Sequence, residues 1–285
     1  MKILITGGAG MLGRTLFRHL SATPSHQVTT LDRKTLDIGQ PDLVRRVVRE
    51  VGPDVILHAA AMTKVDLCET QADEAFRGNA LGSANVAAAA NEAGARLIAF
   101  STDYVFSGLL GRPYHEWDAP DPKTVYGQSK RAAEIAIQQH APNHLILRIA
   151  WLYGRGGPSF VHTMLTLGAK TADAALRVVD DQRGNPTSTD AVAQAVKTLL
   201  DVPLVGTAHL TCEGEATWFE FTREIFRLRG FGRGVDPCTT NDYPRPAPRP
   251  ANSRLDNRVL RLSGLPAMPD WQASIASFLK EYPNG

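Results

Sequence analysis

The chain has 285 residues, of which 43% are hydrophobic, and its 31 basic and 29 acidic side chains leave a formal net charge of +2. This composition predicts a folded core and excludes the clustered positive surface of a nucleic-acid-binding protein. Cys68, Cys212 and Cys238 lack the spacing of a zinc site or a disulfide framework, and the sequence shows neither a secretory leader nor a membrane-spanning apolar run. We therefore expect a cytoplasmic protein with no nucleic acid, membrane or metal as partner.

Short aliphatic runs alternate with amphipathic helical patterns through the first half of the chain. Strands are predicted at 2–6, 27–31, 55–58, 97–101 and 145–149. Helices are predicted to begin near Met11, Asp42, Ala72 and Val125, and the alanine-rich stretch 80–93 is predicted to be a buried crossover helix. This order predicts an α/β fold built on a Rossmann-type doubly wound parallel sheet.

The alternation ends near Trp151, after which glycine, proline and charged residues become frequent, as at 154–158 and 243–250. Such composition is typical of substrate loops, although an ordinary surface linker is an equal alternative for 243–250. We expect a dinucleotide-binding domain at 1–150 and a smaller mixed α/β substrate lobe at 151–285, with some chain returning to the main sheet.

A glycine motif, Gly7-x-x-Gly10-x-x-Gly13, directly follows the first predicted strand and opens the first helix. Glycines in this context allow a tight turn and let backbone amides approach a pyrophosphate. A glycine-rich turn without a ligand is the alternative, but the position at the end of the first strand favours a dinucleotide.

The end of the second predicted strand bears on the choice of cofactor. Asp32 can accept hydrogen bonds from a ribose diol, which favours NADH, whereas Arg33 can pair with a 2′-phosphate, which favours NADPH. The sequence leaves both cofactors open. Asp37 and Ile38 follow, where a carboxylate and a backbone amide can meet adenine, and a plain turn aspartate is equally compatible with the pattern.

A tyrosine and a lysine, Tyr126 and Lys130, lie four residues apart at the start of a predicted helix, so they share one face of it. A tyrosine phenol has an ordinary pKa of about 10, and a nearby cation favours the phenolate. Thr102, at the end of the fourth predicted strand, is the natural third member of this group. The three residues predict proton transfer to or from a carbonyl oxygen.

The chain resembles the extended short-chain dehydrogenase/reductase family, and within it the dTDP-4-dehydrorhamnose reductases. The resemblance covers nearly the whole chain and rests on segments at 58–66, 101–108, 148–154, 179–187 and 249–255. It implies that hydride passes from nicotinamide to the 4-keto carbon of a nucleotide-linked 6-deoxyhexose. In that scheme Tyr126 supplies the proton, Lys130 also holds the nicotinamide ribose, and Thr102 hydrogen-bonds the carbonyl oxygen.

The same resemblance implies two sets of binding residues. Besides the residues already named, it places Met11, Leu12, Ala59, Ala60, Ala61, Thr63 and Asn79 at the cofactor. It places Val65, Asp66, Thr102, Asp103, Tyr104, Trp151, Asn185, Pro186, Arg249, Asn252 and Ser253 at the nucleotide sugar, and Thr63 matches the sugar pocket as well. Asn79 is expected either to support a water relay or to satisfy a buried backbone group.

Two positions depart from the family pattern. His58 stands where many relatives have asparagine, and we expect it to pack beside the cofactor. Some relatives build a magnesium-linked dimer with an acidic residue two positions after the third glycine, where this chain has Thr15. We therefore predict no metal and a monomer or homodimer.

Two other functions stay open. A non-catalytic binding subunit, similar to the regulatory beta subunit of methionine adenosyltransferase, shares the fold, but it has no physical need for all three of Thr102, Tyr126 and Lys130. A reductase for a different nucleotide deoxysugar keeps the chemistry and changes the substrate.

Overall fold

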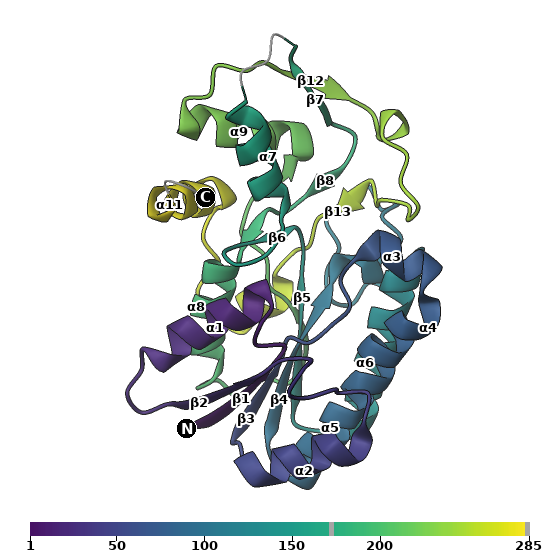
Figure 1. Cartoon of the computed structure of the whole chain (residues 1–285), viewed down its shortest axis with the longest axis vertical. Helices are drawn as coiled ribbons and strands as arrows, with labels where there is room; N and C mark the ends of the chain where they lie inside the picture. Colours follow the sequence, from purple (N-terminus) through teal and green to yellow (C-terminus); the bar gives the residue numbers. More distant parts are fainter. Residues whose placement is uncertain (171–173, 283–285) are drawn as a thin grey trace.

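The central element is a six-stranded parallel sheet with the strand order β10-β5-β4-β3-β1-β2, seen edge-on in Figure 1. The computed structural model describes residues 1–170 and 174–282. The strands are β1 (Lys2–Thr6), β2 (Gln27–Leu31), β3 (Val55–His58), β4 (Arg96–Thr102), β5 (His144–Ile149) and β10 (Gly206–His209). The predicted α/β fold and the five predicted strands are confirmed to within one residue at each end.

Strand β1 packs on both faces because its side chains alternate between them. Ile3 and Ile5 belong to the core under α1 (Met11–Ser21) and α8 (Thr189–Leu199). Leu4 belongs to the opposite core. The helices over that second face are α2 (Pro41–Val51), α5 (Gly82–Glu92) and α6 (Val125–His140). The sheet is therefore covered on both sides, as its nearly continuous apolar strands require.

The order of the strands creates a switch point at β1. The chain passes from β1 to β2 on one side of it and then crosses back to β3 on the other side, so the direction of winding reverses here. In open parallel sheets, ligands bind at the carboxyl ends of the strands at such a point. The loops after β1, β2, β3 and β4 hold the predicted cofactor and catalytic residues, and they meet at this edge.

The segment between β3 and β4 departs from the single helix expected from Ala72. The chain forms α3 (Val65–Thr70), which the sequence analysis missed, then α4 (Ala72–Ala75), a π-helical stretch (Phe76–Leu81) and α5. Stretches of π-helix are rare and occur frequently at functional sites. Here the π-helical stretch contains Asn79, one of the predicted cofactor residues.

The second half of the chain forms a smaller lobe above the carboxyl edge of the sheet (Figure 1). Its helices are α7 (Phe160–Gly168), α9 (Trp218–Arg229) and α11 (Trp271–Glu281), whereas α10 (Arg258–Leu262) packs into the core of the main sheet. Its short strands are β6 (Leu152–Tyr153), β7 (Leu176–Val179), β8 (Arg183–Gly184), β9 (Thr187–Ser188), β11 (Ala216–Thr217), β12 (Val235–Cys238) and β13 (Asn252–Ser253). Strand β10 and helix α8 return to the main sheet.

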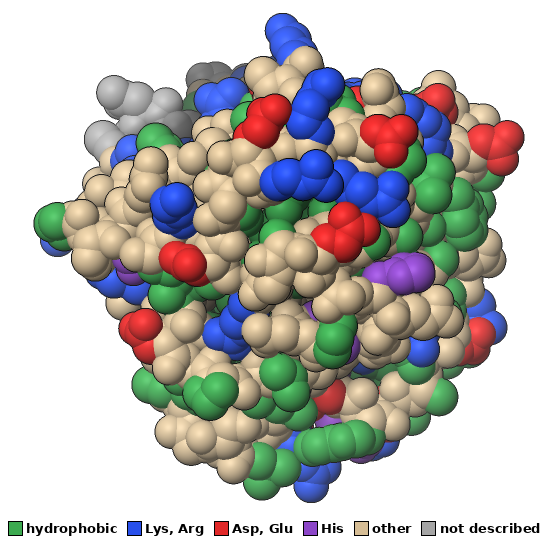
Figure 2. All heavy atoms as spheres, turned by 90° about the horizontal axis from the view of Figure 1, so that it is seen from below, with side chains coloured by type: hydrophobic (Ala, Val, Ile, Leu, Met, Phe, Trp, Pro, Cys, Tyr) green, Lys and Arg blue, Asp and Glu red, His purple; other side chains and the backbone are tan. Residues whose placement is uncertain are grey.

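The surface seen from below in Figure 2 has basic, acidic and hydrophobic side chains interspersed. Within the described ranges, no helix is long and apolar enough to cross a membrane.

Candidate functional site

The loops after β1 and β3 press against each other at the switch point, and only glycine fits between them. Gly7 has a φ of +75°, and a Cβ there would lie 2.6 Å from the amide nitrogen of Ala60. A Cβ on Gly13 would lie 2.3 Å from the carbonyl oxygen of Gly7. Gly10 is the N-cap of α1 and has no side chain to bond the amides of the first turn. This cradle fits a pyrophosphate approaching the backbone.

At the end of β2, Asp32 folds its carboxylate back onto its own turn. One carboxylate oxygen accepts hydrogen bonds from the amides of Lys34 at 2.9 Å and Thr35 at 3.1 Å. These bonds, those of Thr35 first, lower the pKa of Asp32. Arg33 is exposed and lies 3.6 Å from Glu74, on the rim of a hollow lined by Arg33 and residues 70–74. A carboxylate and a guanidinium thus both stand where the adenosine end of a dinucleotide is expected.

Asp37 is a structural turn residue as well as a candidate for adenine. Its carboxylate accepts a hydrogen bond from the Arg77 guanidinium at 2.6 Å and from the amide of Gly39 at 3.0 Å. The side chain of the adjacent Ile38 is buried and lies over Gly82, where a Cβ would come within 2.6 Å of it. The turn-aspartate alternative therefore describes what Asp37 does in this structure.

The predicted catalytic pair lies in the first turns of α6. Thr124 caps this helix by accepting a hydrogen bond from the Gly127 amide at 3.0 Å. The helix packs so closely that a Cβ on Gly127 would lie 2.2 Å from the Tyr104 carbonyl oxygen. Tyr126 and Lys130 are both buried, and the Lys130 ammonium donates a hydrogen bond of 2.7 Å to the carbonyl oxygen of Phe100 on β4. The structure therefore joins the start of α6 to the carboxyl end of β4.

Burial shifts both members of the pair away from their charged forms. It raises the pKa of Tyr126 well above its ordinary value, and a hydrogen bond with Thr102 opposes this effect. It lowers the pKa of Lys130 to about 8, an effect that Glu134 opposes. The expectation that Lys130 lowers the pKa of the phenol is therefore wrong for this structure, since burial is the larger influence. A protonated phenol suits a proton donor.

Thr102 connects the pair to the next loop. Its hydroxyl accepts a hydrogen bond of 3.2 Å from the Tyr104 amide and donates one of 2.9 Å to the carboxylate of Asp103. Asp103 is buried, and burial raises its pKa to about 6 against hydrogen bonds from Ser253 and Thr102. The ring of Tyr104 meets that of Tyr126 edge-on, with centroids 5.5 Å apart. Thr102, Asp103, Tyr104 and Tyr126 therefore form one cluster, which Ser253 reaches from the C-terminal lobe.

His58 and Asn79 are buried polar residues that hydrogen-bond to neighbours at the predicted cofactor side of the site. The His58 ring lies between the hydroxyl oxygens of Thr6, at 2.7 Å, and Ser83, at 3.0 Å, and burial lowers its pKa to about 3. It is a neutral packing residue, as expected. Asn79 hydrogen-bonds both the amide and the carbonyl of Met62, at 2.7 and 3.1 Å. Asn79 thus satisfies buried backbone and fixes the loop after β3.

The backbone of Trp151 is unusual. Of the non-glycine residues that the structure describes, Trp151 alone has a positive φ, at +47°. A conformation of this kind costs roughly 1–3 kcal/mol for a bulky residue, and such outliers cluster at functional sites. Its indole stacks on that of Trp218, with centroids 3.4 Å apart and planes 6° apart. Stacked aromatic pairs contribute about 0.5–1.5 kcal/mol beyond their buried area, which offsets part of that cost.

The polar residues expected from the C-terminal lobe divide into two groups. Arg249 forms an ion pair with Asp66, 2.9 Å from the guanidinium to each carboxylate oxygen, so two predicted sugar-site residues meet. The amide of Asn252 is saturated by Leu110, Arg112 and Arg254. The Asn185 amide bonds the Gly214 carbonyl and the Leu255 amide. The Asn252 amide thus joins the C-terminal lobe to the loop after β4, and Asn185 uses both ends of its amide within the lobe. Contacts of these two residues with the nucleotide sugar stay predictions.

The chain matches the family model described as the RmlD substrate binding domain over residues 1–284. It belongs to this family.

Similar proteins of this family have solved structures. The chain is 42% identical to a dTDP-4-dehydrorhamnose reductase of Clostridium acetobutylicum, with a TM-score of 0.96 over 99% of this chain and 100% of that one. It is 37% identical to the dTDP-4-dehydrorhamnose reductase of Bacillus anthracis solved in complex with NADP, with a TM-score of 0.95 over 98% and 99% of the two chains. It is also 40% identical, over 96% of this chain and 93% of the relative, to a protein of Streptomyces antibioticus named a probable dTDP-4,6-dihydroxy-2-methyloxan-3-one 4-ketoreductase.

The remaining candidates lie around these groups. Met11 is the first residue of α1, and the next residue, Leu12, is buried. Ala59, Ala60 and Ala61 are half-buried in the loop after β3. Thr63 is exposed, and Val65 is the first residue of α3. Pro186 is buried between β8 and β9. Trp218 is not among the residues predicted from the sequence; the capping box of Thr217 and Glu220 marks the start of its helix, but no local signal reveals the partner of its indole.

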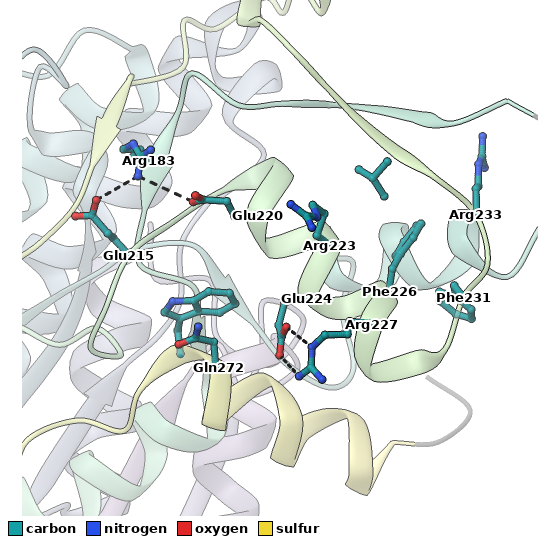
Figure 3. Close-up of a pocket in the computed structure, with 12 residues that line it drawn as sticks. Arg183, Glu215, Glu220, Arg223, Glu224, Phe226, Arg227, Phe231, Arg233 and Gln272 are labelled. Atoms are coloured by element: carbon teal, nitrogen blue, oxygen red, sulfur yellow. Dashed lines mark hydrogen bonds and ion pairs between the residues drawn. The ribbon is translucent and has the colours of Figure 1, made fainter.

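A separate hollow of about 630 Å³ lies over α9 and contains no predicted site residue (Figure 3). Several of its charged side chains pair with one another: Arg183 lies between Glu215 and Glu220, and Arg227 pairs with Glu224. We assign no function to it.

Proposed function

We propose that this chain catalyses the reduction of the 4-keto group of a nucleotide-linked 6-deoxyhexose, with dTDP-4-dehydro-L-rhamnose as substrate and dTDP-L-rhamnose as product. The proposal rests on Thr102 at the end of β4, which hydrogen-bonds Tyr126, and on Lys130, which lies one turn further along α6 and bonds the Phe100 carbonyl of β4. The family match over the whole chain supports it, as do the names of its relatives.

A bound NADPH or NADH supplies the hydride that the reduction needs. The order of the loops along the sheet edge suggests how the dinucleotide lies, since Asp32 follows β2, the glycine cradle follows β1, the alanines follow β3 and Thr102 ends β4. Asp32 and Arg33 would hold the adenosine, Gly7 to Gly13 would hold the pyrophosphate, and Thr102 would stand at the reacting end.

The side chains divide the remaining work. Tyr126, held protonated by burial, gives its phenol proton to the oxygen that becomes the alkoxide. Thr102 orients that oxygen by hydrogen bonding. Lys130, whose pKa is lowered by burial to about 8, carries a positive charge below that pH and would bind the nicotinamide ribose. Asp66, Tyr104, Trp151 and Arg249 line the space left for the nucleotide sugar.

A reductase of a different nucleotide 4-keto-6-deoxysugar is the second candidate, because the Streptomyces antibioticus relative at 40% identity is named for another sugar. The third, a non-catalytic binding subunit, has no need for a buried phenol, a buried ammonium and a hydroxyl at one sheet edge.

The test is to follow oxidation of NADPH and of NADH by the purified chain with a panel of dTDP- and GDP-linked 4-keto-6-deoxysugars. The proposal predicts fastest turnover with dTDP-4-dehydro-L-rhamnose and formation of dTDP-L-rhamnose. Faster turnover of another member would support the second candidate. Dinucleotide binding without turnover of any member would refute both reductase assignments.

A further inference from the structure

Trp151 lies just beyond the end of β5, next to the end of β4 that carries Thr102. In the pairing of β4 with β5, Thr102 lies opposite Ile149, and Trp151 follows two residues later. Its left-handed backbone directs the indole away from the course a regular strand would take. Such a conformation persists for a bulky residue only where the surroundings hold it. The residues that contact this indole therefore determine how its ring is oriented at the proposed sugar site.

Trp151 packs against the apolar cluster that contains Val105 and Phe106, and two further contacts hold its ring. Trp218 stacks flat against it, at 3.4 Å between centroids. Gly184 lies against its edge so closely that a Cβ there would be 2.3 Å from the indole Cε2. The contacts with Trp218 and Gly184 both come from the C-terminal lobe, so the lobe contributes to the orientation of a residue that belongs to the sheet edge.

Trp218 is itself held on several sides. Its indole N–H donates a hydrogen bond of 3.0 Å to the side-chain oxygen of Gln182, whose amide nitrogen donates one of 2.9 Å to Thr240. The ring of Phe160 on α7 lies 4.3 Å from it, centroid to centroid. Neither Trp218 nor Gln182 belongs to the cluster of Thr102, Asp103, Tyr104 and Tyr126 or to the glycine cradle. Trp218 and Gln182 therefore hold Trp151 in place from outside the proposed site.

We propose that Trp218 is a positioning residue that fixes the Trp151 indole against the sugar. The inference rests on the proposed function and adds a residue to it. A flat aromatic surface packs against the apolar face of a deoxyhexose, and its tilt decides how the keto carbon faces the hydride donor. Loss of Trp218 should therefore affect the nucleotide sugar and leave the dinucleotide alone.

The experiment compares Trp218→Leu, which fills the space without a flat ring, with Trp218→Phe, which keeps one. Using the nucleotide sugar that the wild type reduces, we expect the KM of the sugar to rise about tenfold in the leucine variant and about threefold in the phenylalanine variant, since small misplacements are costly in catalysis. The Kd of NADPH should not change. The exciton-coupled circular dichroism bands of the stacked indoles should disappear in both variants.

A double-mutant cycle separates positioning from general stability. If Trp218 acts through Trp151, the variant lacking both rings should lose no more activity than Trp151→Ala alone. Trp271→Phe, a buried tryptophan in the core of the same lobe, is the matched control and should keep both the KM and the exciton bands. Should Trp218→Leu not fold, Trp218→Phe decides.

Three results would overturn the inference while leaving the proposed function intact: an active wild type with unchanged sugar KM in the Trp218 variants, a parallel loss of NADPH and sugar affinity, or additive effects in the cycle. An inactive wild type with every sugar would instead refute the proposed function and this inference with it.

Discussion

The carboxylate of Asp66 and the guanidinium of Arg249 form an ion pair across 183 positions of sequence, with 2.9 Å from one Arg249 nitrogen to each oxygen. Asp66 also accepts a hydrogen bond of 3.2 Å from the Ala247 amide. Together these contacts tie the proline-rich segment 243–250 to α3. The segment is thus attached over the sheet edge, which is not the behaviour of a plain surface linker.

Breaking this pair should weaken binding of the nucleotide sugar. Asp66→Asn and Arg249→Ala should each lower kcat/KM for the sugar by about tenfold and together should be less than additive, since the two residues act as a unit. NADPH binding should not change. Arg245→Ala, an exposed arginine of the same segment, is the control. Additive losses in the double variant would show that the two side chains act separately.

Tyr126→Phe should remove the proton donor. We expect kcat to fall by about 10²- to 10⁴-fold, the usual contribution of a positioned acid, with the Kd of NADPH nearly unchanged because the phenol serves the chemistry. Single-turnover kinetics and dinucleotide titration measure the two quantities. Tyr153→Phe removes another buried phenol, one that bonds Ser274 in the C-terminal lobe, and should keep full turnover. Wild-type kcat in Tyr126→Phe would refute the assignment.

The pH dependence should report Lys130. Burial lowers its pKa to about 8, so its positive charge is present below that pH and is lost above it. We expect kcat/KM for the sugar to fall as pH rises through about 8. Lys130→Arg keeps the charge and should move this limb to higher pH in whatever activity remains. If kcat/KM fell at the same pH in both proteins, the fall would belong to a group other than Lys130.

The same shift predicts a stability effect of opposite direction. Between about 8 and the ordinary value of 10.5, the unfolded chain holds the proton of this lysine and the folded chain does not. The contribution of Lys130 to the free energy of unfolding therefore rises with pH across this window. Denaturant titrations of the wild type and of Lys130→Met over that range should show the slope only in the wild type.

Cofactor preference should depend on Glu74. This carboxylate lies 3.6 Å from Arg33 and competes with a 2′-phosphate for the guanidinium. Glu74→Gln should raise the ratio of kcat/KM with NADPH to that with NADH by roughly two- to fivefold, a modest effect because the pair is exposed. Arg33→Ala should lower the ratio. Asp73→Asn, an exposed neighbour, controls for overall charge; an equal change there would argue against a specific pair.

The sequence by itself determined the sheet and the chemistry attached to it. Aliphatic runs fixed the five predicted strands, and the spacing of Tyr126 and Lys130 placed both on one buried side of α6. These features were predictable because period and spacing are local properties of a strand or a helix. The family resemblance added the residues of the C-terminal lobe, but not their contacts.

Only the tertiary structure decided which side chains remain available to a ligand. It paired Asp66 with Arg249, saturated Asn252, turned Asn79 onto Met62 and stacked Trp151 on Trp218. It also decided the direction of the pKa shift of Tyr126, because burial exceeds any nearby charge there. Contacts between residues far apart in the chain, and the exclusion of water from them, depend on how the elements pack, and no local pattern in the sequence encodes that packing.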